Sequence, residues 1–181
     1  RERVDRSRAL LERWVKEKRA IYGVTTGFGQ LCTTGIAPED AEKLQKNILF
    51  SHAVSVGEPL PEECVRGILL MILQNLGQGY SGVRRCLLER FRQFLNLGLT
   101  PWAPGDGSVG YLAPEAHIAQ VVAGYGKAYY HGRLFPAREA LAICGLAPLP
   151  LSYKEGLALI SGTTSVTALA ALALYDMEKA A

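Results

Sequence analysis

The stretch Pro61-Glu62-Glu63-Cys64-Val65-Arg66-Gly67-Ile68-Leu69-Leu70-Met71-Ile72-Leu73 decides the fold class of this chain. A proline followed by two carboxylates is typical of a helix start, because proline suits the first turn and the helix dipole favours negative charge there. The apolar run that follows is too short for a membrane-spanning helix, which needs about 20 residues. We therefore predict a buried helix that begins near Pro61.

Helical patterns continue on both sides of this stretch. We predict helices over residues 1–19, 38–52, 83–95, from 114, over 136–145 and from about 153, the last interrupted at 161–164. Within the helix over 83–95, Arg84, Arg85, Glu89 and Arg90 are expected to face outward. A Gly- and Pro-rich loop is expected over 98–113, and a turn at His131-Gly132 predicts a short β-hairpin. The fold class is therefore all-α with a minor hairpin, in one domain without repeats or linkers.

Composition excludes several classes of function. The net charge is +3, and the 20 Lys and Arg residues are scattered, so we expect neither a nucleic-acid partner nor a membrane partner. The four cysteines form no CxxC pair and the three histidines show no zinc spacing, so no metal site is expected. Isolated thiols and the absence of a signal peptide or a long uncharged span indicate a cytoplasmic protein.

Both ends of the chain interrupt a helical pattern. Arg1 begins one without a capping residue, and residues 177–181 end another without a Gly or Pro stop signal. We expect these residues to be a portion of a longer polypeptide.

The first candidate for chemistry is Tyr22-Gly23-Val24-Thr25-Thr26-Gly27-Phe28-Gly29. Its glycines let the backbone approach a ligand closely, and its tyrosine could act as an acid or a base. Taken alone, a glycine-rich turn with a packed tyrosine is the simpler interpretation.

Two further segments are candidates. His52, in Phe50-Ser51-His52-Ala53, lies near a helix end and could contact a substrate ring, although a structural hydrogen bond is the commoner role. The loop over 105–114 contains three glycines, and Pro114 starts a helix whose positive end stabilises negative charge in that loop. An ordinary connection between helices is the alternative. His117 and His131 have no comparable context and are interpreted as structural or exposed.

Together these segments resemble the aromatic amino acid ammonia-lyases, most of all the histidine ammonia-lyases, in order over nearly the whole chain. The matches are Tyr22–Gly29 to the signature YGxxTGFG, Ser51–Ala53 to its histidine-bearing variant, Tyr80–Arg85 to the SGxRR segment, Gly107–Gly110 and Leu112–His117 to the flanks of the electrophile loop, and Glu155–Leu159 to the segment before the substrate-binding turn. The resemblance implies that residues 1–181 are the N-terminal portion of such a lyase domain.

The resemblance also implies a mechanism. In the family an internal Ala-Ser-Gly triad cyclises to a methylidene-imidazolone (MIO), which the substrate attacks so that ammonia leaves more easily. By this comparison Tyr22 is the base that removes a β-proton, and His52 and Leu112 contact the aromatic side chain. Gly29 and Ser161 lie at the substrate, and the helix from Pro114 stabilises developing charge. The family forms tetramers with shared sites, and later chain and neighbouring subunits supply the other groups, including an arginine for the carboxylate.

The triad itself is a departure from the family. Gly110 is followed directly by Tyr111, where the family has Ala-Ser-Gly and then usually Asp-Leu-Ala-Pro. We interpret Gly110 and Tyr111 as flanks of an MIO formed between them, because a sequence restricted to standard residues omits a cyclised triad. A true deletion would instead leave a catalytically inactive helical structural or interaction protein.

The second departure is Ser161-Gly162-Thr163-Thr164, where the family commonly has Asn-Gly-Thr-Gln. Serine offers one hydroxyl in place of an amide near the substrate carboxylate. His52 favours L-histidine as substrate and urocanate as product. Tyrosine and phenylalanine ammonia-lyases and aminomutases of the same family are the alternatives.

Overall fold

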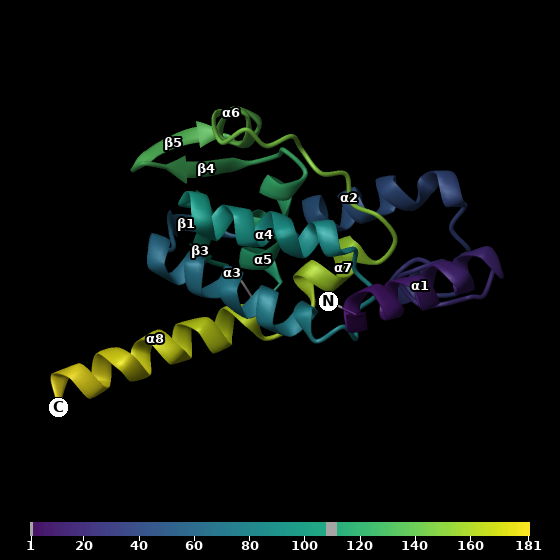
Figure 1. Ribbon diagram of the computed structural model, residues 1–181, viewed down its shortest axis with the longest axis horizontal. Helices are drawn as coiled ribbons and strands as arrows, with labels where there is room; N and C mark the ends of the chain where they lie inside the picture. Colours follow the sequence, from purple (N-terminus) through teal and green to yellow (C-terminus); the bar gives the residue numbers. More distant parts are fainter. Residues whose placement is uncertain (1, 108–111) are drawn as a thin grey trace.

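A computed structural model describes residues 2–107 and 112–181 (Figure 1). The helices are α1 (Glu2–Lys16), η1 (Gly29–Leu31), η2 (Pro38–Asp40), α2 (Ala41–His52), α3 (Glu62–Gly77), α4 (Arg85–Leu97), α5 (Ala113–Val122), α6 (Ala137–Ile143), α7 (Glu155–Ile160) and α8 (Thr164–Ala180). The strands are β1 (Val56–Pro59), β2 (Leu99–Pro101), β3 (Pro104–Asp106), β4 (Lys127–Tyr130) and β5 (Arg133–Pro136). The predicted mainly helical class is confirmed.

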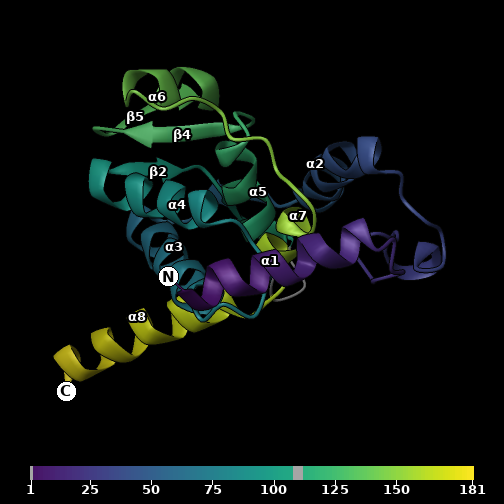
Figure 2. The same cartoon turned by 45° about the vertical axis from the view of Figure 1, so that its right-hand side comes forward.

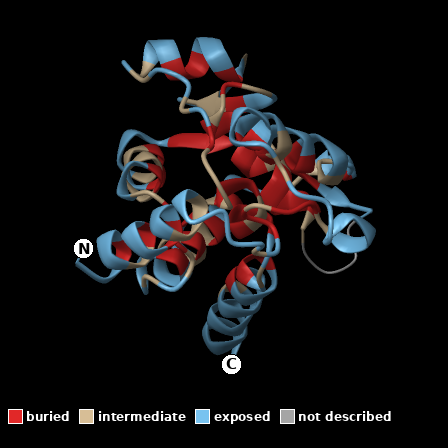
Figure 3. Cartoon of the chain, turned by 90° about the vertical axis from the view of Figure 1, so that its right-hand side faces the viewer, coloured by how far each residue is buried: buried red, intermediate tan, exposed pale blue. Residues whose placement is uncertain are grey.

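Helix α3 forms the centre of the core, as its apolar run predicts. It packs against α8, α4 and β2, and both Ile68 and Leu69 are fully buried. Phe91 and Phe94 of α4 are also fully buried, and their rings meet edge to face. Leu70 is 54% exposed, so α3 keeps one face outside the core rather than being buried all round. Figure 3 shows the buried residues gathered in the interior between the helices.

Two small antiparallel sheets lie beside the helices. Strands β4 and β5 form the hairpin predicted at His131-Gly132, and β2 pairs with the other edge of β4. Strands β1 and β3 form the second sheet. The prediction of a plain loop over 98–113 is therefore wrong for β2 and β3. Gly98, which ends α4 with φ 69°, supplies the left-handed conformation that lets the chain turn into β2.

Helices α2, α5 and α7 pack against one another in pairs. In Figure 2 they lie on the side of α3 opposite to α8's free end, with α1 crossing in front of α7. These helices carry His52 at the last residue of α2, Leu112 just before α5 and Ser161 just after α7. The three-helix contact therefore joins the segments that carry the predicted site.

The segment Glu155–Ala180 is long and apolar enough to cross a membrane by length and composition, and 33% of its most apolar window is buried. The prediction that the chain has no long span suited to a bilayer therefore did not take account of this segment. The structure divides it at Ser161–Thr163 into helices of 6 and 17 residues, both shorter than the about 20 residues that a spanning helix needs. The first part of α8 packs on α3, and its C-terminal end projects from the molecule (Figure 1).

All four cysteines are free thiols, with Cys32 and Cys86 exposed. Burial raises the pKa of Cys64 and of Cys144. The cysteines therefore form no disulfide framework in this fold, as their isolated positions predict.

Candidate active site

The loop that follows α1 presents Tyr22 to solvent with its oxygen held in place. The side chain is 55% exposed, and the backbone N–H of Gly29 donates a hydrogen bond to the Tyr22 Oη at 3.2 Å. The ring of Phe28 meets that of Tyr22 edge to face, with centroids 6.2 Å apart. Because amide donors stabilise negative charge on oxygen, this arrangement suits a tyrosine that accepts a proton. Gly29, predicted to lie at the substrate, is thus the direct partner of Tyr22.

The same loop is fixed against α7. A Cβ at Gly23 would lie 2.3 Å from the Leu157 side chain, and Gly23 has φ 68°, so only glycine fits this close approach. The position of α7 therefore sets the position of Tyr22's loop.

His52 ends α2 with one ring nitrogen bound to its own helix. Nδ1 lies 2.9 Å from the carbonyl oxygen of Ile48 and 2.9 Å from Oγ of Ser51. A carbonyl only accepts hydrogen bonds, so the contact with Ile48 places the proton on Nδ1. In the neutral ring Nε2 is then the acceptor, available to a donor on a substrate.

Leu112 precedes α5 in an unusual backbone conformation. It has φ 85°, a value that is rare for a residue with a side chain. Gly110 and Tyr111 lie outside the described residues. The amino-acid sequence joins them directly, and its 181 residues contain no Ala-Ser-Gly triad. The 181 residues of the sequence therefore do not include the triad from which an MIO forms.

Ser161 lies at the exposed end of α7, where its backbone N–H donates to the carbonyl of Leu157 at 3.0 Å. The turn then leads into α8, whose start is bound by Glu115 of α5. The Glu115 carboxylate accepts hydrogen bonds at 2.8 Å from the Thr164 hydroxyl and from the Ser165 backbone N–H. Ser161 lies three residues before Thr164, and Leu112 lies three residues before Glu115. Each of them therefore precedes one partner of this hydrogen bond.

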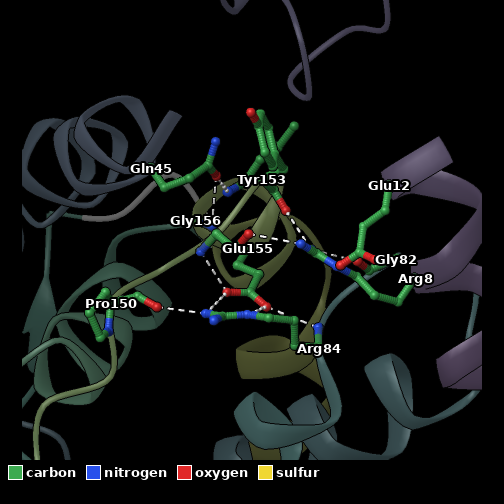
Figure 4. Close-up of polar contacts among 11 residues, drawn as sticks. Arg8, Glu12, Gln45, Gly82, Arg84, Pro150, Tyr153, Glu155 and Gly156 are labelled. Carbon is green, nitrogen blue, oxygen red and sulfur yellow. Dashed lines mark hydrogen bonds and ion pairs between the residues drawn. The ribbon is translucent and has the colours of Figure 1, made fainter. Parts of the chain in front are cut away.

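The N-terminal end of α7 is held by polar contacts from other helices (Figure 4). Glu155 is fully buried and receives the Arg84 guanidinium at 2.6 and 2.9 Å. The hydrogen bonds between the Arg84 guanidinium and this carboxylate raise the pKa of Arg84. From α2, the Gln45 Oε1 accepts the backbone N–H of Gly156 at 2.8 Å, and a Cβ at Gly156 would lie 2.6 Å from the Gln45 carbonyl oxygen. Arg84, predicted to face outward, instead faces this carboxylate.

The two remaining histidines lie outside this arrangement of polar contacts. His117 is half-buried beside Trp102, and burial lowers the pKa of its ring. His131 is exposed in the turn between β4 and β5. Within residues 2–107 and 112–181, no group of three His, Cys, Asp or Glu side chains could hold a metal ion.

Sequence reasoning missed the residues that hold the site rather than those that face it. Gln45, Glu115 and Arg84 have the pattern of ordinary helix-surface or helix-start residues. Their burial depends on partners that are distant in the sequence, so periodicity could not reveal them. In the sequence, only the resemblance of Glu155–Leu159 to a family segment points to the start of α7.

Comparison with known proteins shows which family the chain belongs to. The family model described as aromatic amino acid lyase matches residues 1–181. The chain belongs to the aromatic amino acid lyase family. It is 48% identical over 178 residues to a histidine ammonia-lyase of Streptococcus pyogenes, covering 97% of this chain and 35% of that protein.

Solved structures of the aromatic amino acid lyase family have the same fold. A Pantoea agglomerans phenylalanine aminomutase matches with a TM-score of 0.93 and 38% identity, covering 98% of this chain and 34% of that one. A Trypanosoma cruzi histidine ammonia-lyase matches with a TM-score of 0.91 and 35% identity, covering 96% and 34% respectively. The chain thus spans about a third of the length of these relatives.

The Glu155 contacts allow a stability prediction. Replacing Glu155 with Ala removes the acceptor of two half-buried backbone N–H groups, those of Arg84 and Ser152, and the partner of the Arg84 guanidinium, which keeps its hydrogen bond to the Pro150 carbonyl. We expect the free energy of unfolding to fall by about 1–3 kcal/mol, measured by urea denaturation of the protein followed by circular dichroism.

Glu89→Ala is the matched control, because Glu89 pairs with Arg92 on the exposed face of α4. An exposed pair contributes little to stability because water screens its charges, so we expect a much smaller loss for this variant. Equal losses for Glu155→Ala and Glu89→Ala would contradict the role given to the buried carboxylate.

Proposed function

We propose that the protein containing this chain is a carbon–nitrogen lyase that eliminates ammonia from an aromatic amino acid, with L-histidine as substrate and urocanate as product. The observation that carries the proposal is an exposed tyrosine, Tyr22, whose oxygen is held by the Gly29 N–H in a chain of the lyase family. Both residues belong to the segment that matches the family signature.

His52 supports histidine as the substrate. Its Nδ1 is bound to the Ile48 carbonyl, which leaves Nε2 to accept a hydrogen bond from an N–H of a substrate imidazole. The same acceptor fits the hydroxyl of tyrosine, so a tyrosine ammonia-lyase is the nearest alternative. The names of relatives include a phenylalanine aminomutase and a tyrosine aminomutase, which keeps an aminomutase as a second alternative.

The residues of this chain then have separate roles in the proposed reaction. Tyr22 removes the β-proton of the substrate, His52 orients the ring, and Leu112 forms an apolar wall beside it. The N-terminal end of α5 offers the positive end of its dipole to charge that develops in the loop before it. Ser161 lies at the amino and carboxylate end of the substrate.

The rest of the site belongs to chain beyond these residues and to neighbouring subunits of a homotetramer in the cytoplasm. In the family the MIO electrophile makes ammonia a better leaving group. For this chain an MIO between Gly110 and Tyr111 stays a prediction, since the printed residues lack the triad.

A mass measurement tests the electrophile directly. The natural protein is digested, and the peptide that spans Gly107 to His117 is weighed. We expect a mass above that of the printed residues by Ala, Ser and Gly less two waters. A mass equal to that of the printed residues would show that no electrophile forms between Gly110 and Tyr111. A catalytically inactive structural or interaction protein would then replace the lyase as the proposed function.

Tyr22→Phe tests the base. Removing the hydroxyl removes the proton acceptor, so we expect kcat of the full protein to fall by about 100- to 10,000-fold, while circular dichroism stays unchanged. Tyr80→Phe is the matched control, because Tyr80 is 82% exposed. If the Tyr22→Phe protein keeps most of its kcat, Tyr22 is not the base.

His52→Leu tests the ring contact. Loss of the acceptor should shift the ratio of kcat/KM for phenylalanine over histidine upward by about tenfold, or about 1.4 kcal/mol. The products from His, Tyr and Phe are measured side by side. An unchanged ratio would exclude contact between His52 and the ring, and inertness of the unaltered protein towards all three would exclude the proposed reaction.

A further inference from the structure

The carboxylate of Glu115, like that of Glu155, is buried within the part of the chain that the structure describes. Its residue is 1% exposed, although it stands in the first turn of α5, where a glutamate would ordinarily face water. Burial of a carboxylate is costly unless donors satisfy it. Here the donors come from α8, far away in the sequence: the Thr164 hydroxyl and the Ser165 N–H, both at 2.8 Å from Oε1.

These donors lie at one end of the turn that carries Ser161. The other end of the turn is the end of α7, which Glu155 and Gln45 already hold in place. The turn over 161–163 therefore lies between two fixed points. Helix α5, which follows the electrophile loop, packs against α7 at the first and accepts hydrogen bonds from α8 at the second. A shift of α5 would move Ser161 through the Glu115 contact.

The chemistry of the contact matches the local departure from the family. Thr164 stands where the family commonly has glutamine, and Ser161 where it commonly has asparagine. A threonine hydroxyl is a short donor that reaches a carboxylate on the facing helix, as the 2.8 Å distance shows. Ser161 begins the turn and Thr164 is the first residue after it, so both changed positions lie within four residues of chain that Glu115 fixes at one end.

We propose that Glu115 is a positioning residue for the reaction: its carboxylate fixes the Ser161 turn against the segment at Leu112, so that Ser161 meets the amino and carboxylate end of the substrate. This inference rests on the proposed function. Glu115 acts through hydrogen bonds that it accepts, and its second oxygen, Oε2, is buried without a partner among the described residues. The charge of the carboxylate is not needed for this role, only an acceptor oxygen at the place of Oε1.

A double-mutant cycle tests the coupling. In the full protein, Glu115→Ala should lower kcat/KM by about tenfold, the size expected for loss of a hydrogen bond of about 1.4 kcal/mol to a charged group. In the Ser161→Ala background the same change should have little further effect, because the residue that it positions is gone. Additive effects would overturn the positioning role, since a merely structural role lowers activity equally in both backgrounds.

Glu115→Gln separates acceptor from charge. The amide oxygen of glutamine can accept from Thr164 and Ser165, so this variant should keep kcat/KM close to that of the unaltered protein. A loss as large as that of Glu115→Ala would overturn the proposal in favour of a role for the negative charge. Glu139→Ala is the matched control, because Glu139 occupies the first turn of α6 and is exposed.

Amide hydrogen exchange gives a readout that does not need activity. Glu115→Ala should speed exchange in the peptide covering 161–167, while Glu115→Gln and Glu139→Ala should not. Unchanged exchange in Glu115→Ala would overturn the contact itself. Failure of the proposed function looks different: the unaltered protein is inert towards His, Tyr and Phe, and the positioning role then falls with it.

Discussion

The fold depends on one ion pair, between the buried carboxylate of Glu155 at the start of α7 and the partly exposed guanidinium of Arg84 before α4. A carboxylate with no solvent exposure is unfavourable by several kcal/mol unless its oxygens are fully hydrogen-bonded, and here each oxygen is. Besides the guanidinium, the Arg84 backbone N–H donates at 2.9 Å and the Ser152 backbone N–H at 2.7 Å. Arg8 of α1 extends the same network by donating to Ser152 Oγ at 2.8 Å. The acid thus joins the segment of Arg84 to the start of α7, and Arg8 ties α1 to the same segments through Ser152, Tyr153 and Gly82 (Figure 4).

The position of the candidate site follows from this anchor because α7 is too short to place itself. A helix of 6 residues has little stability of its own and takes its position from its contacts. Glu155 fixes where α7 starts, and Gln45 ties that start to the helix that ends at His52. Gly23 packs on Leu157 in the middle, and Ser161 emerges at the end. The loop of Tyr22, the end of α2 and the Ser161 turn are therefore arranged around one short helix.

The sequence predicts the parts of this arrangement that have a local cause. Apolar spacing and proline starts place the long helices, and the turn at His131-Gly132 places the β4–β5 hairpin. The strands β2 and β3 escape prediction because they are short and depend on partners elsewhere in the chain. Arg84 and Glu115 escape it for the same reason, since a charged residue at a helix start looks exposed until its partner is known. The family resemblance identifies Tyr22 and His52, but it does not indicate that Gly29 holds the tyrosine oxygen.

The departures of this chain from the family pattern are not spread evenly over the site. The segments of Tyr22 and His52, to which we assign the β-proton and the ring in the proposed function, keep the pattern, whereas the junction at Gly110-Tyr111, Ser161 and Thr164 do not. Ser161 lies in the turn before α8 and Thr164 is the first residue of α8, which Glu115 joins to the helix following that junction. A change in one of two hydrogen-bonded segments alters the fit of the other, so replacements there are expected to occur together. Under the proposed function, the departures of this chain therefore gather where we place the amino and carboxylate end of the substrate, while the segments that we assign to the ring keep the family pattern.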